Sequence, residues 1–115
     1  MSEIHPLINP ESKHYESDGR NRIFDIEKKL SVTEMIGAAR FNIEKYDFRK
    51  DKKGQRNSDI AKLTTYINYL ACLSRIEDML KDIGEQPYST TVYDAIGKLN
   101  IAWGNWKEWV DVDHR

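Results

Sequence analysis

The chain has 115 residues, which is the length of one ordinary domain. Charged residues make up 32% of it, which suits a small charge-rich helical domain and leaves no room for a second independent core. The 18 Lys and Arg residues nearly balance the 19 Asp and Glu residues, so the formal charge is −1. This balance argues against general binding to nucleic acid, because proteins that bind polyanions carry a basic excess.

The cysteine and histidine content excludes two further classes. Cys72 is the only cysteine, so an internal disulfide is excluded, and its apolar neighbours predict a buried thiol. The histidines His5, His14 and His114 lie far from Cys72 in sequence, so we expect no metal site. The N-terminus lacks the pattern of a secretory signal, and no apolar run approaches the ~20 residues that cross a bilayer. We therefore expect a cytoplasmic protein with no membrane interaction.

The first half of the chain predicts a lead-in and two helices. Residues 1–20 should be irregular, because turn dipeptides with Pro and Gly interrupt any helical period. Residues 21–112 should form a single helical domain, beginning with a short helix over 22–30. The sequence Ser31-Val32-Thr33-Glu34 is a capping box and predicts a second helix that runs to about Lys50.

The second half predicts two further helices. Asn57 or Ser58 should cap a third helix that ends near Ile83, before Gly84. From residue 90 onward, apolar residues at spacings of 3 and 4 predict one long Trp-rich helix over about 90–110. Together the elements predict an all-α fold, a small bundle of three to four helices with an irregular N-terminal segment.

The predicted last helix has two features of its own. Gly97 and Gly104 are seven residues apart and would form a groove that another helix can approach closely. We interpret the groove as a packing feature within the chain. The alternative is a homo-oligomer that forms through this groove and through Trp103, Trp106 and Trp109, which need something to cover them.

Polar and basic residues form a row on each of the two central helices. Residues at steps of 3 or 4 share one side of a helix, and antiparallel packing across a short loop brings the two rows together near one end of the pair. The second helix contributes Asn42, Lys45, Arg49 and Lys52, and the third contributes Asp59, Lys62 and Tyr66.

This combination fits a phosphate group. Arg binds two oxygens with a planar fork, Lys supplies a point charge, and the N-terminus of a helix adds backbone donors. Tyr66 and Asn42 would hold a base or sugar by stacking and hydrogen bonding. The alternative is a solvated charged face, which is common on helices and adds little stability.

Other motifs of nucleotide chemistry are absent from the sequence. No GxxxxGK[ST] occurs, which excludes an ordinary P-loop kinase. The acidic residues Glu27, Glu34, Glu44 and Asp47 do not form the facing pairs of a magnesium-dependent pyrophosphohydrolase.

Four short motifs resemble a known family over about residues 13–70. They are His14-Tyr15, Ile23-Phe24-Asp25-Ile26, Asn42-x-x-Lys45-Tyr46-x-x-Arg49-x-x-Lys52 and Asp59-Ile60-x-Lys62-x-x-x-Tyr66. In order and spacing they resemble the SaV-like family, a small bacteriophage family of helical domains of uncharacterised function, some described as nucleotide kinases. The resemblance implies a phage accessory protein in the host cytoplasm, with His14, Asn42, Lys45, Arg49, Lys52, Asp59, Lys62 and Tyr66 as its ligand-site residues.

Two functions stay open at this point. The first is binding of a nucleotide or other phosphorylated small molecule, which extends to a P-loop-independent deoxynucleoside monophosphate kinase with Mg and ATP as cofactors. The second is a non-catalytic counter-defence protein that sequesters a nucleotide-derived signal or inhibits a host protein. Whether the protein is an enzyme is left open, as is the identity of the ligand.

Overall fold

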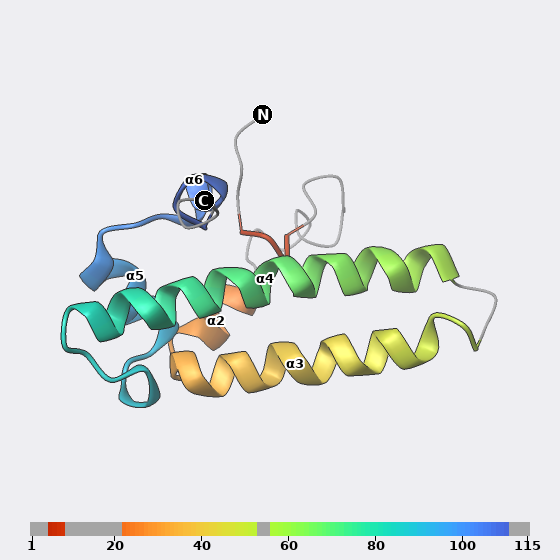
Figure 1. The fold of residues 1–115 in the computed structure, drawn as a ribbon, viewed down its shortest axis with the longest axis horizontal. Helices are drawn as coiled ribbons and strands as arrows, with labels where there is room; N and C mark the ends of the chain where they lie inside the picture. Colours follow the sequence, from red (N-terminus) through yellow and green to blue (C-terminus); the bar gives the residue numbers. More distant parts are fainter. Residues whose placement is uncertain (1–4, 9–21, 53–55, 111–115) are drawn as a thin grey trace.

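The protein is described from a computed structural model, which covers residues 5–8, 22–52 and 56–110. Within these ranges all regular structure is helical, so the predicted all-α class is confirmed (Figure 1). Residues 9–20 of the predicted lead-in, including His14, lie outside the described residues. Residues 5–8 form a turn with a buried His5.

The first three helices follow the predicted order. Helix α2 spans Arg22–Glu27, α3 spans Val32–Arg49 and α4 spans Arg56–Asp82. The predicted capping box at the start of α3 is confirmed. The Ser31 hydroxyl accepts a hydrogen bond from the Glu34 amide at 3.0 Å, and the Glu34 carboxylate accepts one from the Ser31 amide at 2.9 Å.

Helix α4 stops where the sequence predicts. Gly84 adopts a φ of 80°, a conformation that costs a residue with a Cβ but not glycine. The Glu85 amide then donates to the Leu80 carbonyl at 2.9 Å, which closes the last turn.

Helices α3 and α4 lie side by side and antiparallel, and α2 and α5 pack near the end where α3 begins and α4 finishes (Figure 1). The core lies at this end. Its buried members include Val32, Met35 and Ala39 from α3, and Tyr69, Cys72, Leu73, Ile76 and Leu80 from α4. Cys72 is buried, as predicted. The opposite end of the pair, next to the loop between α3 and α4, is left to polar and half-buried side chains.

Backbone hydrogen bonds join the N-terminus of α3 to the N-terminus of α5. The Val32 amide donates to the Thr90 carbonyl at 2.9 Å, and the Val92 amide donates to the Leu30 carbonyl at 3.1 Å. Thr91 caps α5 by accepting a hydrogen bond from the Asp94 amide at 3.1 Å. These contacts fix the C-terminal part against the start of α3.

The predicted single helix over residues 90–110 is wrong. The chain forms a 3₁₀ turn η1 (Pro87–Ser89), helix α5 (Val92–Leu99), a second 3₁₀ turn η2 (Trp103–Asn105) and a short helix α6 (Trp106–Val110). Asn100 ends α5 in the left-handed region with a φ of 56°, which Asn tolerates better than most residues. The chain then turns back, so α6 lies on the side of α4 that faces away from α3 (Figure 1).

This break removes the predicted helical groove. Gly97 lies in α5 and Gly104 lies in η2, so they do not share a helix face. The three tryptophans are only 8–9% exposed and belong to this chain's own core. The homo-oligomer contact that we considered for Trp103, Trp106 and Trp109 therefore has no exposed surface to form on.

No helix in the described ranges has both the length and the apolar character that a bilayer crossing requires.

Candidate functional site

Three of the positive charges predicted to meet converge around one aromatic ring at the polar end of α3 and α4. The Lys45 Nζ lies 4.8 Å from the centroid of the Tyr46 ring, and the Arg49 Cζ lies 5.7 Å from it. The Lys62 Nζ approaches the same ring from α4, at 5.5 Å. All three distances are in the range of cation–π contacts. We call Lys45, Tyr46, Arg49, Asp59, Lys62 and Tyr66 the basic cluster.

A second ring lies beside the first. Tyr46 of α3 and Tyr66 of α4 are stacked, with centroids 6.0 Å apart and ring planes inclined by 20°. Both side chains are half-buried. The pair therefore replaces the aliphatic core at this end of the helices and presents aromatic surface next to the three cations.

Asp59 is the acidic member of the basic cluster. It lies in the first turn of α4 and is fully buried, where the helix dipole favours a negative charge. An Arg49 guanidinium nitrogen lies 3.8 Å from Asp59 Oδ1, an ion-pair distance that is too long for a hydrogen bond. Among the described residues, neither carboxylate oxygen of Asp59 has a hydrogen-bond partner. Such a buried group normally has one, so Asp59 is unusual in this fold.

The nearby acidic residues do not balance the cluster. Lys50 forms ion pairs with Asp47 at 2.9 Å and with Asp51 at 3.5 Å, and its hydrogen bond with Asp47 raises the pKa of Lys50. The ion pairs between described residues do not include Lys45 or Lys62. The basic cluster thus carries three cations against the single charge of Asp59.

The remaining predicted site residues make other contacts. The Asn42 amide nitrogen donates to the Ala38 carbonyl in its own helix at 3.0 Å. The Lys52 Nζ lies 4.7 Å from the Phe48 ring, on the exposed side of α3. His14 lies outside the described residues. The described contacts therefore join Lys45, Arg49, Asp59, Lys62 and Tyr66, but do not add Asn42 or Lys52 to them.

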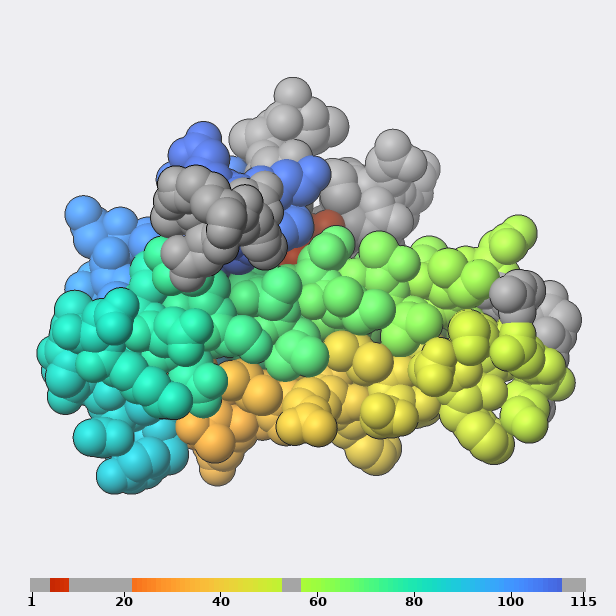
Figure 2. All heavy atoms as spheres, viewed as in Figure 1, coloured from red at the N-terminus to blue at the C-terminus, as the bar shows by residue number. Residues whose placement is uncertain are grey.

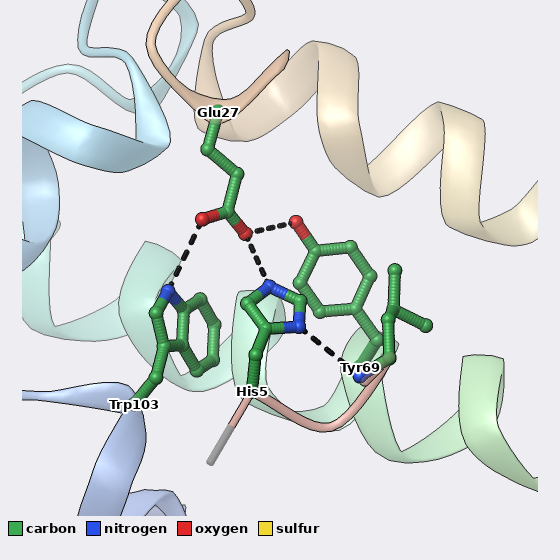
Figure 3. A network of polar contacts seen from close by, with 5 residues as sticks. His5, Glu27, Tyr69 and Trp103 are labelled. Atoms are coloured by element: carbon green, nitrogen blue, oxygen red, sulfur yellow. Dashed lines mark hydrogen bonds and ion pairs between the residues drawn. The ribbon is translucent and has the colours of Figure 1, made fainter. Parts of the chain in front are cut away.

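The sequence did not reveal a second, buried polar group (Figure 3). Glu27 accepts hydrogen bonds from the Tyr69 hydroxyl at 2.5 Å and from the Trp103 indole at 3.1 Å, and its Oε2 lies 2.7 Å from His5 Nε2. The Leu7 amide donates to His5 Nδ1 at 3.1 Å. Because Nδ1 accepts, the proton of a neutral imidazole is on Nε2 and is donated to Glu27.

These contacts give Glu27 a structural role. Three donors solvate one buried carboxylate, and they come from the N-terminal turn, α4 and η2. Burial, with the negative charge of Glu27, raises the pKa of the Tyr69 hydroxyl far above its usual value. The phenol therefore stays protonated and able to donate. No spacing rule predicts this group, because its members are 22, 42 and 76 positions from Glu27 in sequence.

The fold and the cluster define an all-α protein whose two longest helices bring a basic aromatic group to one end. The chain matches the family described as protein of unknown function DUF3310 over residues 9–68, and it belongs to that family. The match covers α2, α3 and the first half of α4, and so includes the whole basic cluster. Neither the curated proteins nor the solved structures give a significant match.

Proposed function

We propose that this protein binds a phosphorylated small molecule, most specifically a nucleotide, at the basic cluster. The observation that carries the proposal is the convergence of Lys45, Arg49 and Lys62 on the Tyr46 ring, with a single carboxylate to offset them. Like charges held close together repel one another, and a bound anion would remove that repulsion. A phosphate monoester carries about −1.5 to −2 at neutral pH, which matches the excess left after Asp59 is counted.

The stacked tyrosines support a nucleotide over inorganic phosphate. A base can stack on an aromatic side chain, and each such contact contributes roughly 1–3 kcal/mol in nucleic-acid complexes. Tyr66 is half-buried and already parallel to Tyr46, so its ring is held in place before a ligand arrives. The phosphate would then lie toward the lysines and Arg49, and the base toward the rings.

The fate of the bound molecule separates two forms of this proposal. In the first, the protein is a P-loop-independent nucleotide kinase, as the resemblance to the phage family implies. The buried Asp59 would then position the acceptor or a magnesium ion, while the three cations offset charge on the transferred group. In the second, the protein holds the nucleotide unchanged, as a counter-defence protein that sequesters a signal would do. Asp59 favours the first form, because among the described residues neither oxygen of this buried carboxylate has a hydrogen-bond partner, and such groups normally have one.

Calorimetric titration with nucleoside mono-, di- and triphosphates and cyclic nucleotides tests the binding. We expect Arg49→Ala to weaken the affinity by about tenfold or more, since hydrogen bonds to charged groups contribute ~1.5–3 kcal/mol. Arg40→Ala is the matched control, because Arg40 is an exposed arginine on the same helix outside the cluster. An equal effect of the two substitutions, or no binding by any nucleotide, would refute the proposal.

Incubation of each deoxynucleoside monophosphate with ATP and magnesium then tests turnover. If the protein is a kinase, the wild type forms diphosphate, and Asp59→Asn abolishes the product while calorimetry still shows binding. Binding without any product, in the wild type as well, would select sequestration instead.

A further inference from the structure

Asp59 is a buried acceptor at the edge of a site for anions. Its side chain is 1% exposed, and among the described residues neither oxygen of its carboxylate has a hydrogen-bond partner. The Arg49 guanidinium lies 3.8 Å from Oδ1, which offsets charge but is too long for a hydrogen bond. Buried carboxylate oxygens normally accept hydrogen bonds, so a ligand that supplies a donor would remove this deficit.

The order of side chains along α4 indicates which part of a nucleotide would meet Asp59. Tyr66, Lys62 and Asp59 follow one another at steps of four and three, so they share one side of the helix. Arg49 of α3 spans the same order, because its Cζ lies 5.7 Å from the Tyr46 ring and its guanidinium reaches Asp59. Figure 2 shows the end of α3 against the start of α4, where these residues lie. With the base on the rings, the phosphate at the cations meets Asp59, and the sugar lies on the ring side.

The Arg49 side chain gives a ligand access to Asp59. It is 39% exposed, and its one ion pair with a described residue is the loose contact with Asp59. Arginine has a long, flexible side chain that binds phosphate oxygens with a planar fork. A turn of this side chain toward a phosphate would uncover Oδ1 to the same phosphate.

The surroundings of Asp59 favour a proton over a metal ion as its partner. The cations Lys45, Arg49 and Lys62 of the basic cluster would repel a divalent cation. Among the described residues, groups of three or more metal-ligating side chains do not occur. A hydrogen atom carried by the ligand is therefore the donor that the site favours.

We propose that Asp59 accepts a hydrogen bond from a protonated oxygen of the bound phosphate group. This inference rests on the proposed function and adds a rule of selection to it. A carboxylate and a phosphate oxygen repel each other unless a proton lies between them, in which case the P–OH group donates to the carboxylate. The site then prefers a terminal phosphate, which can carry a proton. It rejects sulfate and phosphodiesters, cyclic nucleotides included, because they carry none at neutral pH.

Calorimetric titration with inorganic phosphate and with sulfate at neutral pH tests this selection. The two ions have the same tetrahedral shape, but only phosphate has a proton to donate. We expect the wild type to bind phosphate about tenfold more tightly than sulfate, or better. Asp59→Asn introduces an amide of the same size that can donate to either ion, so the two affinities should come within about threefold of each other. Asp78→Asn is the matched control, because Asp78 is an exposed aspartate on the same helix. Circular dichroism confirms that both variants are folded.

Proton uptake gives a second readout, which does not depend on the affinity. At neutral pH a nucleoside 5′-monophosphate is mainly a dianion, since its second pKa is about 6, so it must take up a proton to donate to Asp59. Calorimetry in two buffers of different ionisation enthalpy should therefore show uptake of about one proton per nucleotide by the wild type and by Asp78→Asn, but not by Asp59→Asn. The other charged and titratable groups of the basic cluster stay in the variant, so the difference reports Asp59. They are Lys45, Tyr46, Arg49, Lys62 and Tyr66.

The outcomes separate this inference from the proposed function. Equal binding of phosphate and sulfate by the wild type, or nucleotide binding without proton uptake, overturns the role of Asp59 but leaves anion binding at the cluster intact. Phosphate selection that persists in Asp59→Asn overturns it too. If the wild type binds neither ion and no nucleotide, the proposed function fails as well.

Discussion

Glu27 shows how a single buried charge is tolerated in this fold. Glu27 is 2% exposed, and the donors to its carboxylate are the neutral groups of Tyr69, Trp103 and His5. A neutral donor offsets the lost hydration of a carboxylate without introducing a second buried charge. Asp59 is equally buried but has the opposite arrangement, with a cation at 3.8 Å and no hydrogen bond from a described residue. We interpret Glu27 as a structural residue and Asp59 as a functional one.

Tyr69→Phe tests the structural role of Glu27. The substitution removes one of three donors to a buried carboxylate, so we expect the free energy of unfolding to fall by about 1.5–3 kcal/mol. Urea denaturation at neutral pH measures the loss. Tyr88→Phe is the matched control and should change little, because Tyr88 is 68% exposed. Equal stability of the two variants would mean that the Tyr69 hydroxyl does not support Glu27.

Tyr69→Phe should also change how the free energy of unfolding depends on pH. The pKa of Tyr69 is raised above the ordinary value of 10.0, first by burial and then by the charge of Glu27. The folded state therefore holds this proton more tightly than the unfolded state does. Its contribution to stability is fully present below about pH 10 and is lost as the pH rises beyond that value. Above about pH 10, wild-type stability should fall more steeply with pH than that of Tyr69→Phe.

At the scale of elements, the start of α3 and the end of α4 were predictable, whereas the start of α4 and the path of the C-terminal part were not. Helix α4 begins at Arg56, so Asn57 and Ser58, which were expected to cap it, lie inside the helix. The capping box at Ser31 and the helix end at Gly84 depend on residues within five positions of one another, so the sequence alone predicts them. The break at Asn100 does not interrupt the apolar spacing, which continues from α5 into α6. The contacts that hold the segment after the break come from distant residues: the Trp103 indole donates to Glu27 at 3.1 Å, and the Arg75 guanidinium donates to the Trp109 carbonyl at 3.3 Å.

Ser31→Ala tests the contribution of the capping box. It removes the acceptor for the Glu34 amide, so the free energy of unfolding should fall by about 0.5–2 kcal/mol. Ser74→Ala is the control, because Ser74 is exposed in the interior of α4 and caps no helix. Thermal or urea unfolding of both proteins, followed by circular dichroism, gives the comparison. A Ser74→Ala loss as large as the Ser31→Ala loss would contradict this role.

At the scale of the whole molecule, most residues of the hydrophobic core lie outside the segment that matches the family. The match ends at residue 68, whereas Tyr69, Leu73, Ile76 and Leu80 of α4 are all fully buried just beyond it. The tryptophans that complete the core lie further on still. The basic cluster thus lies inside the match, and most of the core that supports it lies outside.

A fragment of residues 9–68 should therefore fail to fold by itself. It keeps Val32, Met35 and Ala39 but loses the α4 and α5 side chains that cover them, so too little apolar surface is buried to offset chain entropy. We expect weak helicity and no cooperative thermal transition by circular dichroism. A fragment of residues 5–110 is the control and should melt cooperatively. Cooperative melting of the short fragment would show that the match is a folding unit.

The candidate site was partly predictable for a physical reason. Lys45, Arg49 and Lys62 follow helical spacing on two helices joined by a short loop, and that geometry leaves little freedom in where they meet. The convergence on Tyr46 is the part that spacing did not predict, because a ring turns according to its neighbours. The group around Glu27 was entirely hidden, since its contacts join residues far apart in sequence.

By itself the sequence determined the helical class, the start of α3, the end of α4 and the row of charges, because each follows from neighbours within one or two helical turns. Only the tertiary structure decided that the tryptophans are buried, that the last helix is broken and that His5 reaches Glu27. Those outcomes depend on which side chains, far apart in sequence, pack together in one small core. No pattern of neighbouring residues predicts such contacts.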